Sequence, residues 1–198
     1  QAEGQAVLAR PAMAAAPPAP RPAPRPEPEP EPAPPPERRL EGGAHALLEA
    51  LGRGPRDALT RAEAAVLAGL SPTAGYTRAA WKALAADGRL VERADGRVEA
   101  RTAVDAGPLD PDPVVEAWAA KLGGAAAPLL RRLWTAGPAP AAEAAADVGL
   151  SSTAGYTRTG WKRLRSAGLI VRAAGAWDVA PVLRQLQHLK RADEGAYS

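Results

Sequence analysis

Apolar residues recur every three to four positions over several stretches of the chain, which is the period of a helix. Three leucines on one stripe predict a first helix over Ala44–Leu51. A second helix is predicted to begin at Thr60, because Thr60 and Glu63 have the spacing of a capping box. Gly69 is predicted to end it, since glycine is common just after the last turn of a helix.

A third helix is predicted to follow almost at once. Ser71 would be its N-cap and Pro72 its first residue, which leaves a turn of about three residues between the second and third helices. Thr77, Trp81 and Leu84 stand at i, i+4 and i+7 and are predicted to face the core. Two helices joined by a short turn that contains glycine are typical of a helix-turn-helix.

Short alternating runs come next. Arg89–Arg93 and Arg97–Glu99 flank the dipeptide Asp95-Gly96 and predict a β-hairpin. A helix-turn-helix followed by such a hairpin is predicted to form a winged helix.

The unit occurs twice, at about residues 59–100 and 139–180. When the sequence is shifted by 80 positions, residues 71–84 and 151–164 are identical at ten of fourteen positions. The second copy therefore predicts the same elements. They are helices over Ala125–Leu133, Pro140–Asp147 and Ser151–Ser166, and a hairpin of Leu169–Arg172 and Ala176–Val179 with its turn near Gly175.

The flanking segments differ in composition from the two copies. Of the 22 prolines, 13 lie between Pro11 and Pro36, and such a density of proline prevents helix and sheet. This stretch is predicted to be a disordered, extended tether, with a ligand for a proline-binding domain as the alternative. Gly107–Pro113 is predicted to be a linker, Pro113–Leu122 a connecting helix and Val182–Arg191 a C-terminal helix.

The predicted fold class is therefore mainly α with small β-wings (α+β). The predicted domains are a tether at 1–39, a winged helix at 40–105, a linker and connecting helix at 106–122, a second winged helix at 123–191 and a tail at 192–198.

The residue types that most catalytic and metal sites need are missing or scattered. The sequence has no cysteine, and His45 and His188 lack the spacing of metal ligands, so we predict no metal, no cofactor and no enzymatic activity. No apolar run could span a membrane and no signal peptide is evident, so a cytoplasmic protein without a membrane partner is expected. The start at Gln1 instead of Met is consistent with a processed product or a fragment of a longer protein.

Positive charge is concentrated in the second copy. The chain has 25 basic and 22 acidic residues, a net charge of +3. Residues 71–92 include three basic and two acidic residues, whereas residues 151–172 include five basic residues and no acidic one. A duplex held by phosphate neutralisation would therefore be bound mainly by the second copy.

The side of the third helix opposite its apolar stripe is the side that a recognition helix presents to the major groove. Arginine and lysine there can neutralise phosphates or reach guanine, and tyrosine can donate to phosphate oxygens. The predicted contacts to double-stranded DNA are Tyr156, Arg158, Lys162, Arg163, Arg165 and Arg172 in the second copy and Tyr76, Arg78 and Lys82 in the first.

Gly75 and Gly155 are predicted to lie inside the third helices, where glycine costs about 1 kcal/mol relative to alanine. Two explanations stay open. Either another backbone or DNA comes close at this position, or the first helical turn is frayed.

The stretch LTRAEAAVLAGLSPTAGYTRAAWKALAADGRLV (59–91) resembles the tandem winged-helix tails of bacterial and phage HerA/FtsK-like ATPases. PVVEAWAAKLGGAAAPLLRRLW (113–134) resembles the segment that joins their two winged helices, so the likeness covers about residues 42–180. It implies a DNA-binding tail of a motor-type ATPase. The chain has no G-x-x-x-x-G-K-[ST] motif for nucleotide phosphates, and it has Thr77 and Thr157 where the family has an aromatic residue.

Together these observations predict a non-catalytic DNA-binding module of two winged helices on a proline-rich tether. Two alternatives remain. One is a protein-interaction or assembly module, in which Tyr76, Tyr156 and the wings contact a partner protein or an oligomer is formed. The other is a sequence-specific regulator of transcription.

Overall fold

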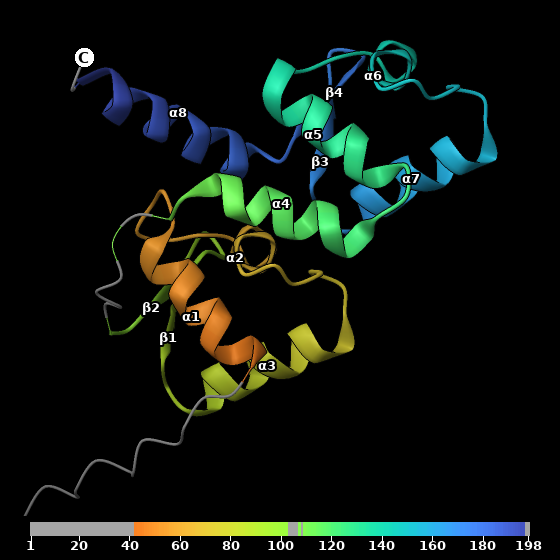
Figure 1. The fold of residues 1–198 in the computed structure, drawn as a ribbon. Helices are drawn as coiled ribbons and strands as arrows, with labels where there is room; N and C mark the ends of the chain where they lie inside the picture. The colour runs from red at the N-terminus through yellow and green to blue at the C-terminus, as the bar shows by residue number, and fades with distance from the viewer. Residues whose placement is uncertain (1–41, 103–106, 108, 197–198) are drawn as a thin grey trace, which may run out of the picture. The chain divides into compact units, whose positions relative to one another are not determined.

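The computed structural model of the chain describes residues 42–102, 107 and 109–196, so the predicted tether lies outside the described residues. The described residues form one compact unit. It is mostly helical, with two small antiparallel sheets, which confirms the α+β class (Figure 1). None of the helices in the described part of the chain is long and apolar enough to cross a membrane.

Each copy of the sequence repeat consists of three helices and a hairpin, and a further helix follows each copy (Figure 1). The first copy, called repeat 1, contains α1 (Gly43–Arg53), α2 (Arg61–Leu67), α3 (Gly75–Ala86), β1 (Leu90–Glu92) and β2 (Val98–Ala100), and α4 (Pro111–Leu122) follows it. The second copy, called repeat 2, contains α5 (Ala126–Ala136), α6 (Ala141–Asp147), α7 (Gly155–Ser166), β3 (Ile170–Ala173) and β4 (Ala176–Val179), and α8 (Pro181–Ala196) follows it.

Helix α2 begins and ends as the sequence predicts. The Thr60 hydroxyl accepts from the backbone N–H of Glu63 at 3.1 Å, and the Glu63 carboxylate accepts from the N–H of Thr60 at 2.8 Å. Gly69, at φ +70°, directs the chain out of α2, and Gly149, at φ +72°, does the same after α6. Glycine suits both positions because a left-handed φ carries no Cβ penalty there.

The predicted start of the third helices is wrong in both repeats. Helix α3 begins at Gly75, three residues after the predicted first residue Pro72, and helix α7 begins at Gly155, four residues after the predicted start at Ser151. The Ser71 carbonyl turns inward instead, where it accepts from the Thr77 hydroxyl at 2.8 Å and from a backbone N–H three residues on at 3.1 Å. Pro72 therefore belongs to a turn, and residues 68–74 connect α2 to α3.

The two glycines are thus the first residues of their helices, not interior ones. A Cβ added to Gly75 or Gly155 would meet nothing within 4 Å among the described residues. The described part of the protein supplies no packing reason for glycine at either position.

Both predicted hairpins are present, with β1 antiparallel to β2 and β3 antiparallel to β4. The two-residue turn at 174–175 has φ values of 49° and 84°, the positive values that a type I′ turn requires. In each repeat, a residue just before the second helix also bonds to the hairpin. The N–H and carbonyl of Leu59 pair with those of Val98, and Ala139 pairs with Trp177 in the same way, at 2.8–3.0 Å.

The predicted core stripe of the third helices is confirmed. Thr77, Trp81 and Leu84 are buried in α3, and Thr157 and Leu164 are buried in α7. Trp161, the remaining member of the stripe, is half-buried and packs against the same core.

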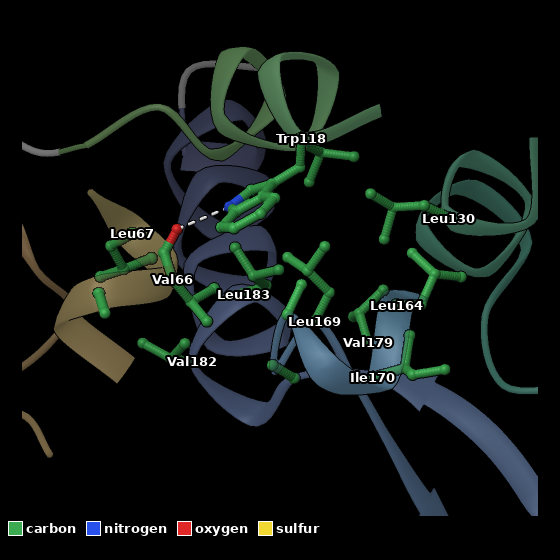
Figure 2. Packing of buried hydrophobic residues seen from close by; sticks show 14 of the residues in the cluster. Val66, Leu67, Trp118, Leu130, Leu164, Leu169, Ile170, Val179, Val182 and Leu183 are labelled. Atoms are coloured by element: carbon green, nitrogen blue, oxygen red, sulfur yellow. Dashed lines mark hydrogen bonds between the residues drawn. The ribbon is translucent and has the colours of Figure 1, made fainter. Parts of the chain in front are cut away.

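The buried side chains of both repeats form one continuous core around Trp118 of α4 (Figure 2). The Trp118 indole N–H donates to the Val66 carbonyl of α2 at 2.8 Å. Lys121, one turn later, donates to the Gly69 carbonyl at 2.9 Å. Helix α4 therefore packs against repeat 1 as well as leading to repeat 2, while the predicted domain boundaries stay predictions.

Candidate nucleic-acid interface

All nine residues predicted to contact DNA are exposed in the structure. The two tyrosines among them, Tyr76 and Tyr156, are 53% and 59% exposed. Five of the six predicted residues of repeat 2 are on α7. They lie on two edges of its exposed side, and the two edges have different surroundings.

Arg158, Lys162 and Arg165 occupy one edge of α7 at i, i+4 and i+7, so they lie in a row along the helix. This row is called the α7 stripe below. None of the three side chains forms an ion pair or a hydrogen bond with a described residue. The α7 stripe therefore presents three exposed cations without a counter-charge in the described part of the chain.

Arg163 and Tyr156 lie on the other edge of α7, next to the junction between α4 and α5. The Arg163 guanidinium donates to the Leu122 carbonyl at the end of α4, at 3.2 Å. The Tyr156 hydroxyl oxygen lies 3.3 Å from the position that a Cβ on Gly124 would take. Both side chains therefore position α7 against this junction, a role that the sequence did not reveal.

The second hairpin is joined to α7 by stacked aromatic rings. The rings of Trp161 and Trp177 lie 5.8 Å apart with 19° between their planes. Arg172 stands opposite Trp177 in the β3–β4 register, and its guanidinium carbon lies 6.0 Å from the Trp177 ring centroid. This stack fixes the hairpin beside α7 and places Arg172 on the Trp177 side of the hairpin.

The acidic residues of repeat 2 are paired with cations outside α7. Residues 123–180 contain three acids, Glu143, Asp147 and Asp178. Arg132 lies 3.7 Å from Glu143 and 2.6 Å from Asp147, and its side chain is only 15% exposed. Arg184 pairs with Asp178. These ion pairs leave no acid of repeat 2 to neutralise the α7 stripe.

Repeat 1 has a different distribution of charge. Arg78 and Lys82, the equivalents of Arg158 and Lys162, are exposed and form no ion pair with a described residue. The position of Arg165 is taken by Ala85. Arg93 and Arg97 of the first hairpin have their own partners, and the pairing of Arg93 with Glu99 raises the pKa of Arg93.

Two further contacts of the first hairpin continue this pattern. Arg61 of α2 lies 3.2 Å from Glu92, and Arg97 lies 3.6 Å from Asp95. Repeat 1 thus presents two unpaired cations on α3 beside a hairpin in which Glu92, Arg93, Arg97 and Glu99 form ion pairs, whereas Arg89 and Arg101 at its ends form none with a described residue.

A cluster of charges attaches α8 to the start of α4. The Lys190 ammonium donates to Asp110 at 3.0 Å and to Asp112 at 2.6 Å, and the Trp134 indole donates to Asp112 at 2.9 Å. The hydrogen bond from Lys190 lowers the pKa of Asp112 and raises that of Lys190, against a smaller opposing effect of desolvation. This cluster orients α8 against the start of α4. It contains no residue of the α7 stripe.

A mostly apolar groove of about 650 Å³ separates the second hairpin from α8. Val171 and Leu189, which are 38% and 47% exposed, lie along it. The side-chain oxygen of Gln185 is buried there without a hydrogen-bond partner. Among residues 42–102, 107 and 109–196, no group of three His, Cys, Asp or Glu side chains could hold a metal ion.

Comparison of the chain with protein-family models, with curated proteins and with solved structures finds no match.

Proposed function

We propose that the chain binds double-stranded DNA, without catalysis, through two winged helices of which repeat 2 makes the main contact. The observation that carries the proposal is the α7 stripe: three aligned, exposed cations, in a repeat whose acids are all paired elsewhere. A phosphate backbone is a regular row of negative charge, with one charge per ~1.7 Å of duplex.

The proposed mode places α7 along the major groove, with the α7 stripe against one phosphate backbone. A recognition helix of a helix-turn-helix is used in this way. Arg172 on the second hairpin would contact a neighbouring phosphate, because the Trp161–Trp177 stack holds the hairpin against α7. Arg163 and Tyr156 would act by positioning α7, through Leu122 and Gly124.

Such binding is mainly electrostatic and depends on salt. Each neutralised phosphate adds about 0.9 to the slope of log affinity against log salt concentration. The resemblance to the tails of HerA/FtsK-like ATPases is consistent with this function. It supports the further proposal that the module serves a motor-type ATPase, which binds the nucleotide elsewhere.

The test is a titration of a labelled duplex with the full chain at several salt concentrations. We expect Arg158→Ala/Lys162→Ala to reduce the slope by roughly two units and the affinity in about 0.1 M salt by roughly 50-fold. Arg131→Ala/Arg191→Ala removes the same charge from exposed sites on α5 and α8 and is the control for net charge, although Arg131, unlike Arg158 and Lys162, is paired with a carboxylate, that of Glu116. Affinity that does not respond to salt, or equal losses in both double variants, would refute the proposal.

The apolar groove beside α8 favours a second candidate, a protein-interaction or assembly module. Leu189→Asp should abolish assembly in that case and leave duplex binding unchanged. A regulator of transcription would be recognised by protection of one defined operator sequence, whereas the proposed module protects many sequences similarly.

A further inference from the structure

We infer that the two repeats bind one continuous duplex as a rigid pair, with Arg78 and Lys82 of α3 making a second, weaker contact beyond the segment that α7 occupies. This inference rests on the proposed function. It adds that the partner is a duplex long enough to lie across both repeats.

The first argument is that repeat 1 is fixed to repeat 2 by buried contacts. Trp118, which is 1% exposed, donates its indole N–H to the Val66 carbonyl in α2. A buried donor of this kind is costly to leave without its partner, so the bond holds α4 to repeat 1, and the bond from Arg163 to the Leu122 carbonyl holds the end of α4 to repeat 2. Lys121 adds a bond to the carbonyl of Gly69, at the end of the same helix.

The second argument is where repeat 2 meets repeat 1. Gly168 follows α7 by two residues, and a Cβ added to it would lie 3.4 Å from side-chain atoms of Val66 and Pro72. Pro72 precedes the first residue of α3 by three positions. The end of α7 therefore lies beside the turn that leads into α3, and Figure 1 shows the two repeats in similar orientations, with the α2–α3 and α6–α7 connections on the same side.

The third argument is electrostatic. The α7 stripe and the Arg78–Lys82 pair are cations of one sign, and a continuous core holds them in one rigid unit. Fixed like charges repel each other unless a counter-ion neutralises them. Repeats on a flexible linker could each bind a separate duplex, but a rigid pair with neighbouring recognition helices suits one extended polyanion.

The contribution of repeat 1 should be the smaller one. Helix α3 has Ala83 and Ala85 at the positions of Arg163 and Arg165, and Arg93 of the first hairpin is paired with Glu99. Repeat 1 therefore offers two unpaired cations on its third helix, against the three of the α7 stripe.

The experiment compares two labelled duplexes, of about 12 and about 30 base pairs, or roughly one and three helical turns. Affinity and salt slope are measured with the full chain, with Arg78→Ala/Lys82→Ala and with the control Arg131→Ala/Arg191→Ala. The ratio of wild-type to variant affinity is taken at each length, because this ratio cancels the larger number of registers on the longer duplex.

We expect Arg78→Ala/Lys82→Ala to weaken binding to the long duplex roughly tenfold, to reduce its slope by up to two units, and to change binding to the short duplex less than about twofold. Equal effects on both lengths, or no effect on either, would overturn the inference. Energy transfer between two differently labelled duplexes in one complex would also overturn it. If the wild-type chain bound neither duplex in a salt-dependent way, the proposed function itself would be refuted.

Discussion

Repeat 1 and repeat 2 share a buried frame and differ in what they place on it. Thr77 and Thr157 are buried alike, and Gly69 and Gly149 end the second helices alike, yet the exposed sides of α3 and α7 differ at four of their eight positions. The frame is set by side chains that must fit a core, whereas exposed positions can change charge without loss of the fold. The difference between the repeats is therefore most informative on the surface.

One difference lies inside the frame. When the leucines of α1 and α5 are aligned, Gly43 corresponds to Ala125, and in the third helices Ala80 corresponds to Gly160. Each repeat thus has one glycine and one alanine where its first and third helices meet. The glycine is at the first helix in repeat 1 and in the third helix in repeat 2. A Cβ on Gly43 would lie 3.5 Å from Ala80, whereas a Cβ on Gly160 would lie only 2.9 Å from that of Ala125.

The largest expected effect on stability is that of Gly160→Ala. The new Cβ would also lie 3.0 Å and 3.1 Å from backbone atoms of Ala125 and Ala126, which cannot move without shifting α5. Overpacking of this kind costs about 1–3 kcal/mol, and the better helix propensity of alanine returns about 1 kcal/mol. We expect a net loss of up to about 2 kcal/mol in the free energy of unfolding, measured by urea denaturation.

Gly155→Ala in the same helix is the matched control, because its Cβ meets nothing within 4 Å. It should be neutral or stabilise by up to about 1 kcal/mol. Ala125→Gly/Gly160→Ala should recover part of the loss, since it removes the methyl contact and leaves the backbone contacts. Equal stability of Gly160→Ala and Gly155→Ala would show that the two helices are not held at this distance.

These packing relations mark the limit of what the sequence predicts. The helices, the hairpins and the capping box of Thr60 follow from local patterns, because nearby residues determine them. The contact of Gly160 with Ala125 and the bond from Trp118 to Val66 join residues far apart in the chain. The start of α3 was mispredicted for a related reason: Ser71 could cap a helix, but its carbonyl is engaged by the Thr77 hydroxyl.

The next prediction adds to repeat 1 a charge that only repeat 2 has. Ala85→Arg places a third cation beside Arg78 and Lys82, at the position of Arg165. If α3 and α7 both contact DNA as proposed and differ only in exposed charge, the salt slope on a long duplex should steepen by about one unit and the affinity should rise by up to about tenfold.

The control for that gain is Ala117→Arg, which adds the same charge to an exposed position of α4. An identical gain from both variants would mean that the duplex responds to net charge and not to the surface of α3.

The sequence predicts the exposure of the eight candidate contacts on α3 and α7, because helical period separates the two sides of these helices, whereas Arg172 lies on β3. It does not distinguish Arg163 from the α7 stripe, since the bond of Arg163 to the Leu122 carbonyl depends on how α4 packs. The ion pairs that leave the α7 stripe without a counter-charge, such as Arg132 with Asp147, also need the folded structure.

The two buried threonines offer a smaller test. Thr77 donates its hydroxyl to the Ser71 carbonyl at 2.8 Å, whereas the buried Thr157 hydroxyl has no partner. Thr77→Val should therefore cost about 1 kcal/mol of the free energy of unfolding, and Thr157→Val should be neutral or stabilise by up to about 1 kcal/mol. Denaturant titrations of both variants give the signs directly, and an equal cost in the two would contradict the assignment of the hydrogen bonds.

The smallest effect concerns α4 and α8, the helices that follow the two repeats. Lys190 of α8 donates a hydrogen bond to Asp112 of α4. The folded-state pKa of Asp112 is lowered, mainly by the hydrogen bond from Lys190, so its contribution to stability is present above the ordinary carboxyl pKa of about 4 and is lost as the pH falls through the lowered value. Asp112→Asn should therefore lower the melting temperature at pH 7, by at most about 3 °C because the pair is exposed to solvent, and by less near pH 2. The control is Glu116→Gln, because Glu116 is on the same helix as Asp112 and is paired with Arg131 of α5. If the two ion pairs act independently, Asp112→Asn should change the melting temperature by the same amount with and without Glu116→Gln. A melting temperature of Asp112→Asn that differs from the wild type equally at pH 7 and pH 2 would show that the Lys190 contact does not govern the titration of Asp112.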